Sequence, residues 1–346
     1  MENSKNKALQ KAIDQLKGKT KLFPAQYYVD GILKGDISIL SQAITLLESK
    51  SNDHRELADQ LIRECLPHSG KAIRVGITGV PGVGKSTFIE AIGTYILENT
   101  DSKLAVLAID PSSPISGGSI LGDKTRMEKL SMDNRAFIRP SPSSESLGGV
   151  ARKTRETMIL CEAAGYNVIF IETVGVGQSE TAVHQMTDFF LLLMLAGAGD
   201  QLQGIKRGIM EMCDALFITK ADGDNKMNAT RAKAEYTSAL HFYPPKPSGW
   251  VPVVDICSSL DETGIDNVWN QIMKHHNWLS ERGQLEVLRN QQDLDWMNDT
   301  LKERVLNAFF NSPEYLQKVV KIKDDLLQKK MTPFQAADLL FQAKKN

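Results

Sequence analysis

A glycine-rich stretch early in the sequence has the residue types that hold a polyphosphate. It contains Gly79, Gly82 and Gly84 and ends in Lys85 and Ser86, which is the pattern G-x-x-x-x-G-K-[ST]. Glycines let several backbone N–H groups turn inward and approach phosphate oxygens closely. The lysine then reaches the β- and γ-phosphates, and the serine offers its hydroxyl to Mg²⁺. The spacing therefore predicts a nucleoside triphosphate site.

The segments around this stretch decide between a phosphate loop and a mere tight turn. A β-branched run containing Ile73, Val75 and Ile77 precedes it, and apolar residues at helical spacing follow it. A strand that passes through a glycine-rich loop into a helix presents the N-terminus of that helix to an anion. The order of strand, loop and helix favours the phosphate loop, or P-loop.

Two acidic residues are placed to approach the same ligand. Asp110 ends an apolar run at residues 104–110, and Glu172 lies near the end of another at residues 167–173. The carboxyl ends of parallel strands are where α/β sheets gather ligand-binding groups. Asp110 is a candidate for the Mg²⁺ shell, and Glu172 resembles the acid that reaches Mg²⁺ through water at the end of a Walker B strand.

Three loops have the composition of nucleotide-dependent switches. Residues 116–127 combine paired glycines, Asp123 and basic residues, which suits a segment ordered by phosphate and metal; a plain flexible surface loop is the alternative. After the second acid, the N–H of Gly175 can meet the γ-phosphate, and Gln178 belongs to the same predicted switch. A third glycine-rich loop follows the next apolar run.

The segment from Thr219 to Asp222 is close to the N-K-x-D signature of guanine-binding proteins. Asp222 would accept hydrogen bonds from the ring N–H and the exocyclic amine of guanine. Adenine lacks this donor pair and would leave the carboxylate unpaired at a cost of about 1 to 3 kcal/mol. The loop Cys257-Ser258-Ser259 matches the backbone and serine contacts that GTPases make to the guanine oxygen. These residues predict GTP as the nucleotide.

The strand-like runs predict the fold that positions these residues. They alternate with helical segments, which implies an α/β P-loop fold with a mainly parallel sheet and helices on both faces. The runs cover residues 73–77, 104–110, 136–139, 167–173, 188–195, 215–220 and 252–256. We expect an N-terminal helical extension at 1–70, a P-loop GTPase domain at 71–278 and a C-terminal helical region at 279–346.

Helical segments flank the predicted domain on both sides. An N-terminal helical hairpin is expected, with Asp36 as one N-cap and Asn52 or Asp53 as the other. After the last strand we expect helices across 281–310 and 313–330 and a short one that begins near Pro333. The 281–310 segment carries an apolar stripe that packing on the core or on a second copy would cover.

A basic helical face is expected at Arg152, Lys153 and Arg155, on a helix that begins near Leu147. It could contact phosphate or a partner, but we interpret it as a solvated face.

The composition of the chain indicates which kinds of partner and which cellular compartment to expect. A net charge of −1 gives no overall attraction to nucleic acid or to an anionic membrane, so neither is an expected partner. The four cysteines are scattered and the six histidines form no metal-ligand pattern, which predicts buried thiols in a reducing cytoplasm and no structural metal. The N-terminal stretch lacks a signal-peptide core, and no run is long enough to span a bilayer.

The order of the motifs resembles one protein family. Besides the P-loop, the chain contains AIDPSS, SGGSILGDKTRM, LGGVARKTRE, ETVGVGQSE, GAGDQLQGIKRGIME and TKAD in that order. In these motifs the chain resembles the MeaB/ArgK-like P-loop GTPases. The resemblance extends from about Tyr28 to at least Trp278. These are chaperones that couple slow GTP hydrolysis to delivery and repair of adenosylcobalamin in cobalamin-dependent acyl-CoA mutases such as methylmalonyl-CoA mutase.

The resemblance implies a role for each matching residue. It implies switches at 116–127, 172–180 and 197–206, Lys206 as a possible catalytic helper, and a homodimer joined by C-terminal helices. The expected catalytic residues are Lys85, Glu172, Gly175, Gln178 and Lys206. The expected ligands of Mg²⁺ are Ser86, Asp110, Asp123 and Glu172. The expected GTP- and GDP-binding residues are Gly79, Gly82, Val83, Gly84, Lys85, Ser86, Thr87, Thr219, Lys220, Asp222, Cys257, Ser258 and Ser259.

One departure from the pattern bears on guanine binding. Thr219 replaces the usual asparagine, which braces the P-loop and contacts the base. We therefore expect lower guanine affinity, with selectivity retained by Asp222.

Three functions remain in competition at the level of the sequence. The first is a regulatory GTPase that serves a methylmalonyl-CoA or isobutyryl-CoA mutase. The second is a small-molecule kinase related to amino-acid transport, which would need an acceptor pocket with an additional base. The third is a nickel or zinc metallochaperone GTPase, a class that usually carries a cysteine motif or a histidine tract, and this sequence has neither.

Overall fold

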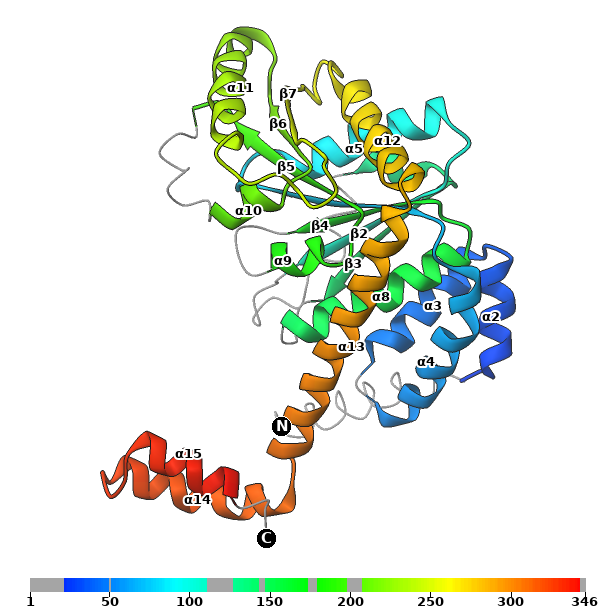
Figure 1. The fold of residues 1–346 in the computed structure, drawn as a ribbon. Helices are drawn as coiled ribbons and strands as arrows, with labels where there is room; N and C mark the ends of the chain where they lie inside the picture. The colour runs from blue at the N-terminus through cyan, green and yellow to red at the C-terminus, as the bar shows by residue number, and fades with distance from the viewer. Residues whose placement is uncertain are drawn as a thin grey trace, which may run out of the picture.

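A seven-stranded parallel sheet forms the centre of the molecule (Figure 1). The computed structural model describes residues 22–49, 51–110, 127–142, 147–173, 179–197 and 207–342. The strands lie in the order β3-β2-β4-β1-β5-β6-β7. Their bounds are β1 Ile73–Gly79, β2 Leu104–Asp110, β3 Ala136–Pro142, β4 Val168–Thr173, β5 Phe189–Leu195, β6 Ala215–Thr219 and β7 Val253–Ile256. Each of the seven predicted runs is a strand, so the predicted fold class is confirmed.

The middle of the sheet is apolar because helices cover both of its faces. All residues of β4 and β6 are buried, as are all but the last of β5. Strands buried on two sides have continuous rather than alternating apolar runs, which is why β5 reads FFLLLML. The strand order brings the carboxyl ends of β1, β4, β5 and β6 together at one edge.

Two groups of helices sandwich the sheet. Helix α5 (Lys85–Asn99) packs with α12 (Ile265–Glu281) and α7 (Glu128–Met132) on one face. Helices α8 (Leu147–Ala163) and α9 (Ser179–His184) cover the other. The remaining helices of this part are α10 Arg207–Met212, the short η3 Gly223–Asn225 and α11 Lys226–Leu240, and α11 lies against β6 and β7.

The described part of the N-terminal extension is a group of three helices packed on α8 rather than a hairpin. It consists of α2 Ala25–Leu33, α3 Ile37–Glu48 and α4 Asn52–Cys65, followed by the single turn η1 Leu66–His68. Asp36 is the N-cap of α3, since its carboxylate accepts from the N–H groups of Ser38 and Ile39 at 2.9 and 3.1 Å. The second predicted cap was wrong: α4 begins at Asn52, so Ser51 occupies the N-cap position.

The basic residues of α8 do not form a solvated face, which corrects the prediction. Arg155 is only 7% exposed; its guanidinium donates to the carbonyl of Gln185 at 3.1 Å and lies 5.7 Å from the ring centre of Trp296. Arg152 pairs with Glu156 at 2.7 Å. Arg155 therefore joins α8 to neighbouring elements of the protein, whereas the pair of Arg152 and Glu156 lies within α8.

The C-terminal helices extend away from the body of the molecule. Helix α13 (Gln284–Phe310) starts beside the sheet and runs outward to α14 (Pro313–Leu327) and α15 (Pro333–Gln342), as Figure 1 shows. We call the outer part of α13, from Leu294 onward, together with α14 and α15, the C-terminal arm. None of the helices in the described residues is long and apolar enough to cross a membrane.

The inner end of α13 is fixed to the sheet by Arg289. Its guanidinium bonds both carboxylate oxygens of Asp188 at 2.9 and 2.7 Å and donates to the carbonyls of Gly70 and Ala72 at 2.6 Å. The side chain of Asp188 is only 2% exposed. Three residues further along, Gln292 donates to the carbonyl of Thr187 at 2.8 Å. These bonds anchor the arm to the turn that precedes β5.

Candidate nucleotide site

The predicted P-loop connects β1 directly to α5. At Gly79, an added Cβ would lie 2.5 Å from the carbonyl oxygen of Leu193, so only glycine fits this close approach of two strands. Gly82 and Gly84 have φ angles of 76° and 87°, in the left-handed region that glycine adopts at no steric cost. The loop therefore has the backbone form that its glycines predict, and α5 begins at Lys85.

Lys85 crosses the loop and points at its backbone. Its ammonium group donates to the carbonyl of Gly79 at 3.0 Å. Partial burial lowers the pKa of this lysine, and the negative charges of Glu172 and Glu180 oppose the shift. A partly desolvated ammonium group at this position is placed to bind the β- and γ-phosphates.

The structure brings Ser86 and Glu172 together across the sheet. The Ser86 hydroxyl lies 3.4 Å from Oε1 of Glu172, and Glu172 is 4% exposed. A hydroxyl beside a buried carboxylate is an oxygen donor set that suits Mg²⁺. The backbone of Asp110 ends β2, whose neighbour in the sheet is β4, so this strand end also lies at the same edge.

The predicted guanine-recognition segments form a connected unit that contacts the P-loop. The hydroxyl of Ser258 donates to Oδ2 of Asp222 at 2.6 Å and accepts from the N–H of Asp261 at 3.1 Å. Lys220 donates from its ammonium group to the carbonyl of Gly82 at 2.9 Å. The N–H of Ala221 bonds the carbonyl of Cys257 at 3.1 Å. The P-loop and both predicted guanine loops are thereby held together.

One residue of this unit was missed at the level of the sequence. Lys220 has a φ of 55°, which is unusual for a residue other than glycine. Asn225 donates from its side-chain amide to the Lys220 carbonyl at 2.7 Å, and its own N–H bonds the carbonyl of Asp222 at 3.0 Å. The T-K-A-D motif gives no signal for Asn225, because the residue lies beyond the motif in η3.

Thr219 takes over part of the bracing role of the usual asparagine. Its hydroxyl lies 2.8 Å from the carbonyl oxygen of Val83 and 3.3 Å from that of Met194. The residue is 2% exposed, so its bond to the P-loop is shielded from water. The bracing contact is therefore present with threonine at this position.

The other predicted site residues divide into two groups. Thr87 lies exposed in the first turn of α5, and Ser259 is partly exposed next to Ser258. Asp123, Gly175, Gln178 and Lys206 lie outside the described residues, as do most of the three predicted switch loops. The side chain of Asp110 is likewise outside the described part.

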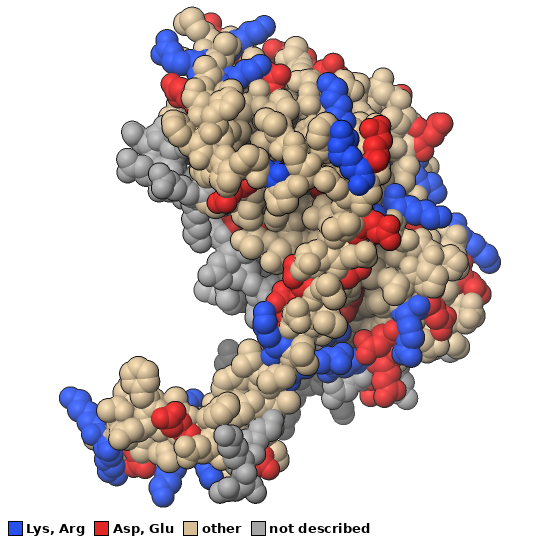
Figure 2. Space-filling view, in the orientation of Figure 1, with Lys and Arg blue, Asp and Glu red and all other residues tan. Residues whose placement is uncertain are grey.

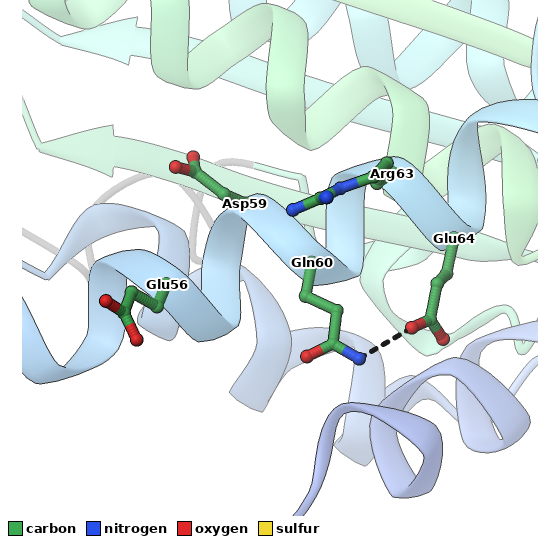
Figure 3. Close-up of a pocket in the computed structure, with 5 residues that line it drawn as sticks. All are labelled: Glu56, Asp59, Gln60, Arg63 and Glu64. Carbon is green, nitrogen blue, oxygen red and sulfur yellow. Dashed lines mark hydrogen bonds between the residues drawn. The ribbon is translucent and has the colours of Figure 1, made fainter.

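A separate surface hollow lies on α4, away from these residues. Glu56, Asp59, Gln60, Arg63 and Glu64 line a volume of about 500 Å³, and Gln60 donates to Glu64 at 2.8 Å (Figure 3). All five residues come from one helix, and the P-loop contributes none. This hollow is a polar helix surface distinct from the nucleotide site.

Comparison with known proteins places the chain in a family. Residues 40–314 match the family model described as methylmalonyl Co-A mutase-associated GTPase MeaB. The chain belongs to this family. The predicted resemblance is thus confirmed, and the protein is a GTPase that binds GTP.

Curated relatives cover most of the chain. GTPase ArgK of Escherichia coli (strain K12) is 47% identical over 85% of this chain and 90% of its own length. Methylmalonic aciduria type A homolog, mitochondrial, of Mus musculus is 44% identical over 93% of this chain and 80% of its own length.

A solved structure agrees with the MeaB-family assignment. The crystal structure of LAO/AO transport system kinase has a TM-score of 0.74 and 37% sequence identity, and the match covers 93% of this chain and 98% of the other.

Proposed function

We propose that this MeaB-family GTPase is a Mg²⁺-dependent chaperone that gates adenosylcobalamin delivery to a cobalamin-dependent acyl-CoA mutase and protects or reactivates it. The family description names methylmalonyl-CoA mutase as the associated enzyme. The observation that supports guanine as the base is the 2.6 Å bond from Ser258 to Asp222, which orients the carboxylate that would accept both guanine N–H donors. A methylmalonyl-CoA or an isobutyryl-CoA mutase is the proposed client.

The described residues support a positional and electrostatic mechanism. The P-loop N–H groups and Lys85 would bind the phosphates and stabilise the charge that spreads over the γ-phosphoryl group as water attacks in line. Ser86 and Glu172 would hold Mg²⁺, with Asp110 and Asp123 as the other predicted ligands. When bound, the metal neutralises charge on the β- and γ-phosphate oxygens. Gly175, Gln178 and Lys206 remain predicted contributors.

The C-terminal arm supports a proposed homodimer. It carries many large apolar side chains that are about half exposed or more, and soluble monomers rarely leave so many together. Examples are Leu294 51%, Met297 58%, Leu301 58%, Val305 57%, Leu316 55%, Val320 65%, Phe334 84% and Phe341 63% exposed. In Figure 2 the arm projects from the body, with lysine and arginine gathered toward its tip. A second copy would cover the apolar side of the arm.

The dimer has its own test. Light scattering after size-exclusion chromatography should give twice the chain mass for the unaltered protein. The double variant Leu301→Asp and Val305→Asp should give the monomer mass. The control Lys302→Asp replaces a charged residue of the same helix and should remain dimeric. A monomeric unaltered protein would refute this assembly.

The compartment is also a proposal. The four cysteines are free and buried, which supports placement in a reducing cytoplasm.

A small-molecule kinase is the second candidate, because the similar solved structure is of a protein named LAO/AO transport system kinase. The two functions differ in the fate of the γ-phosphate. GTP labelled at that position should release free phosphate from the chaperone, whereas a kinase would transfer the label to an amino acid or another metabolite. A metallochaperone gains no support, since the described residues contain no group of three or more histidine, cysteine or acidic residues that could hold a metal ion.

A direct experiment tests the proposed partnership. Purified chain would be mixed with methylmalonyl-CoA mutase or isobutyryl-CoA mutase, and GTP hydrolysis and complex formation would be measured with GDP and with a non-hydrolysable GTP analogue. We expect complex formation to depend on the nucleotide. Indifference to both mutases would contradict the chaperone role while leaving the GTPase assignment intact.

A further inference from the structure

A buried pair of threonine hydroxyls lies where two central strands separate. The parallel pairing of β1 with β4 ends at Ile77 and Glu172. The next residue of each strand is Thr78 and Thr173, whose Oγ1 atoms lie 2.9 Å apart, with Thr173 donating. They are 2% and 0% exposed. The side-chain bond therefore continues the contact between the strands for one residue beyond the backbone ladder.

This pair lies where β1 and β4 separate, next to the P-loop and to Glu172. Beyond Thr78, β1 stays paired with β5 through Gly79 and then enters the P-loop. Strand β4 ends at Thr173. Glu172 is the last residue of β4 that pairs with β1, and its carboxylate lies 3.4 Å from the Ser86 hydroxyl. The hydroxyl pair therefore lies one residue beyond the carboxylate that faces the P-loop.

We propose that the Thr78–Thr173 hydroxyl pair positions Glu172 against the P-loop during GTP hydrolysis. The pair acts through Glu172 and is a positioning element. A hydrogen bond in such a dry place resists rearrangement, because a buried hydroxyl left without a partner is costly. The proposal rests on GTP hydrolysis alone and is independent of any mutase partner.

Two substitutions can separate the effect of the hydroxyl group from the effect of the side-chain shape. Thr173→Val keeps the branched shape and removes the hydroxyl, whereas Thr173→Ser keeps the hydroxyl and removes a methyl group. We expect Thr173→Val to lower kcat for GTP about fivefold to tenfold with KM and GDP affinity changed less than about twofold. Thr173→Ser should retain near-normal kcat although its melting temperature falls by about 2 to 4 °C.

A double variant and a matched control make the test specific. If the two hydroxyls work as one unit, the double variant Thr78→Val and Thr173→Val should be no slower than the slower single variant, within about twofold. Thr154→Val removes an equally buried hydroxyl, which bonds the carbonyl of Val150 within α8, and should leave kcat unchanged.

Three results would overturn the proposal. The first is a kcat that is unchanged in folded Thr173→Val. The second is a Thr173→Ser variant whose kcat is as low as that of Thr173→Val. The third is a double variant whose fold-decrease in kcat equals the product of the decreases in the two single variants. The melting temperature of every variant identifies misfolding, and Thr78→Val with its own serine rescue provides a second route should Thr173→Val not fold.

Discussion

The hydroxyl of Ser258 lies 2.6 Å from the carboxylate of Asp222 and fixes the direction in which that carboxylate faces. The two residues come from loops after different strands, β6 and β7, which are neighbours in the sheet. Ser258 is fully buried, so the bond is protected from competition by water. The proposed guanine contact of Asp222 would therefore be made by a carboxylate that the fold has already oriented.

The first prediction concerns Asp222→Asn. The amide would present a donor where guanine also presents donors, so kcat/KM for GTP should fall about tenfold to a hundredfold and xanthosine triphosphate should become the better substrate. Hydrolysis rates with both nucleotides provide the measurement. Asp224→Asn, an exposed neighbour, should behave like the unaltered protein. An equal decrease in kcat/KM for GTP in both variants would argue against a contact between Asp222 and the base.

The second prediction concerns Thr219. Thr219→Val removes the bond to the Val83 carbonyl and should weaken GDP binding about threefold to tenfold, since a buried hydrogen bond contributes about 1 kcal/mol. Thr219→Asn, which restores the usual residue, should tighten GDP binding. Fluorescent GDP titration measures both. Tight binding by the valine variant would show that the brace is dispensable.

The third prediction concerns the anchor of the C-terminal arm. Arg289→Met would remove the cation that pairs with Asp188 and the donors to two backbone carbonyls, and Asp188 would keep only its bond from the N–H of Arg74 among these contacts. The free energy of unfolding should therefore fall by about 2 to 4 kcal/mol. Lys302→Met removes an exposed ion pair with Asp299 and should cost less than about 0.5 kcal/mol. Urea denaturation distinguishes the two. Similar small losses would show that Arg289 contributes no special stability.

The fourth prediction concerns pH. Burial lowers the pKa of His275 below its ordinary value of 6.5, while Asp214 opposes the shift; burial also lowers the pKa of His184 and His276. Below pH 6.5 the unfolded chain therefore binds more protons than the folded chain, so stability falls as the pH decreases from 7 towards 5. His275→Phe should reduce this slope by up to about 1.4 kcal/mol per pH unit.

An exposed histidine provides the control for the pH experiment. His241→Phe should leave the slope unchanged, because its ring is open to solvent in the folded protein. Thermal unfolding across the pH range gives the measurement. A slope that His275→Phe leaves intact would assign the pH dependence to other groups.

Local signals in the sequence were enough to predict the sheet and the P-loop. Apolar runs bounded by turn residues gave all seven strands, because strands buried on both faces are continuous in hydrophobicity. Gly82, Gly84 and Lys85 occupy the positions that their motif predicts. Asp36 caps its helix because capping needs only residues two and three positions ahead.

The features that escaped prediction depend on contacts between distant parts of the chain. From the pattern of its own helix, Arg155 is expected to be solvated. Its contact with Trp296 depends on the packing of α13 against α8, which the local sequence does not specify. The bond between Thr78 and Thr173 requires the register of β1 on β4, which no local pattern specifies. Helix α2 was missed because it follows Pro24 without a side-chain cap.

One measurement tests the central claim most directly, namely that a guanine-selecting switch in this chain serves an acyl-CoA mutase. Steady-state hydrolysis of GTP and of ATP would be compared with and without methylmalonyl-CoA mutase, with Lys85→Ala as the inactive control. The account predicts a clear preference for GTP and a GTP turnover that changes when the mutase is added. Equal use of ATP, together with a GTP rate that neither methylmalonyl-CoA mutase nor isobutyryl-CoA mutase alters, would contradict it.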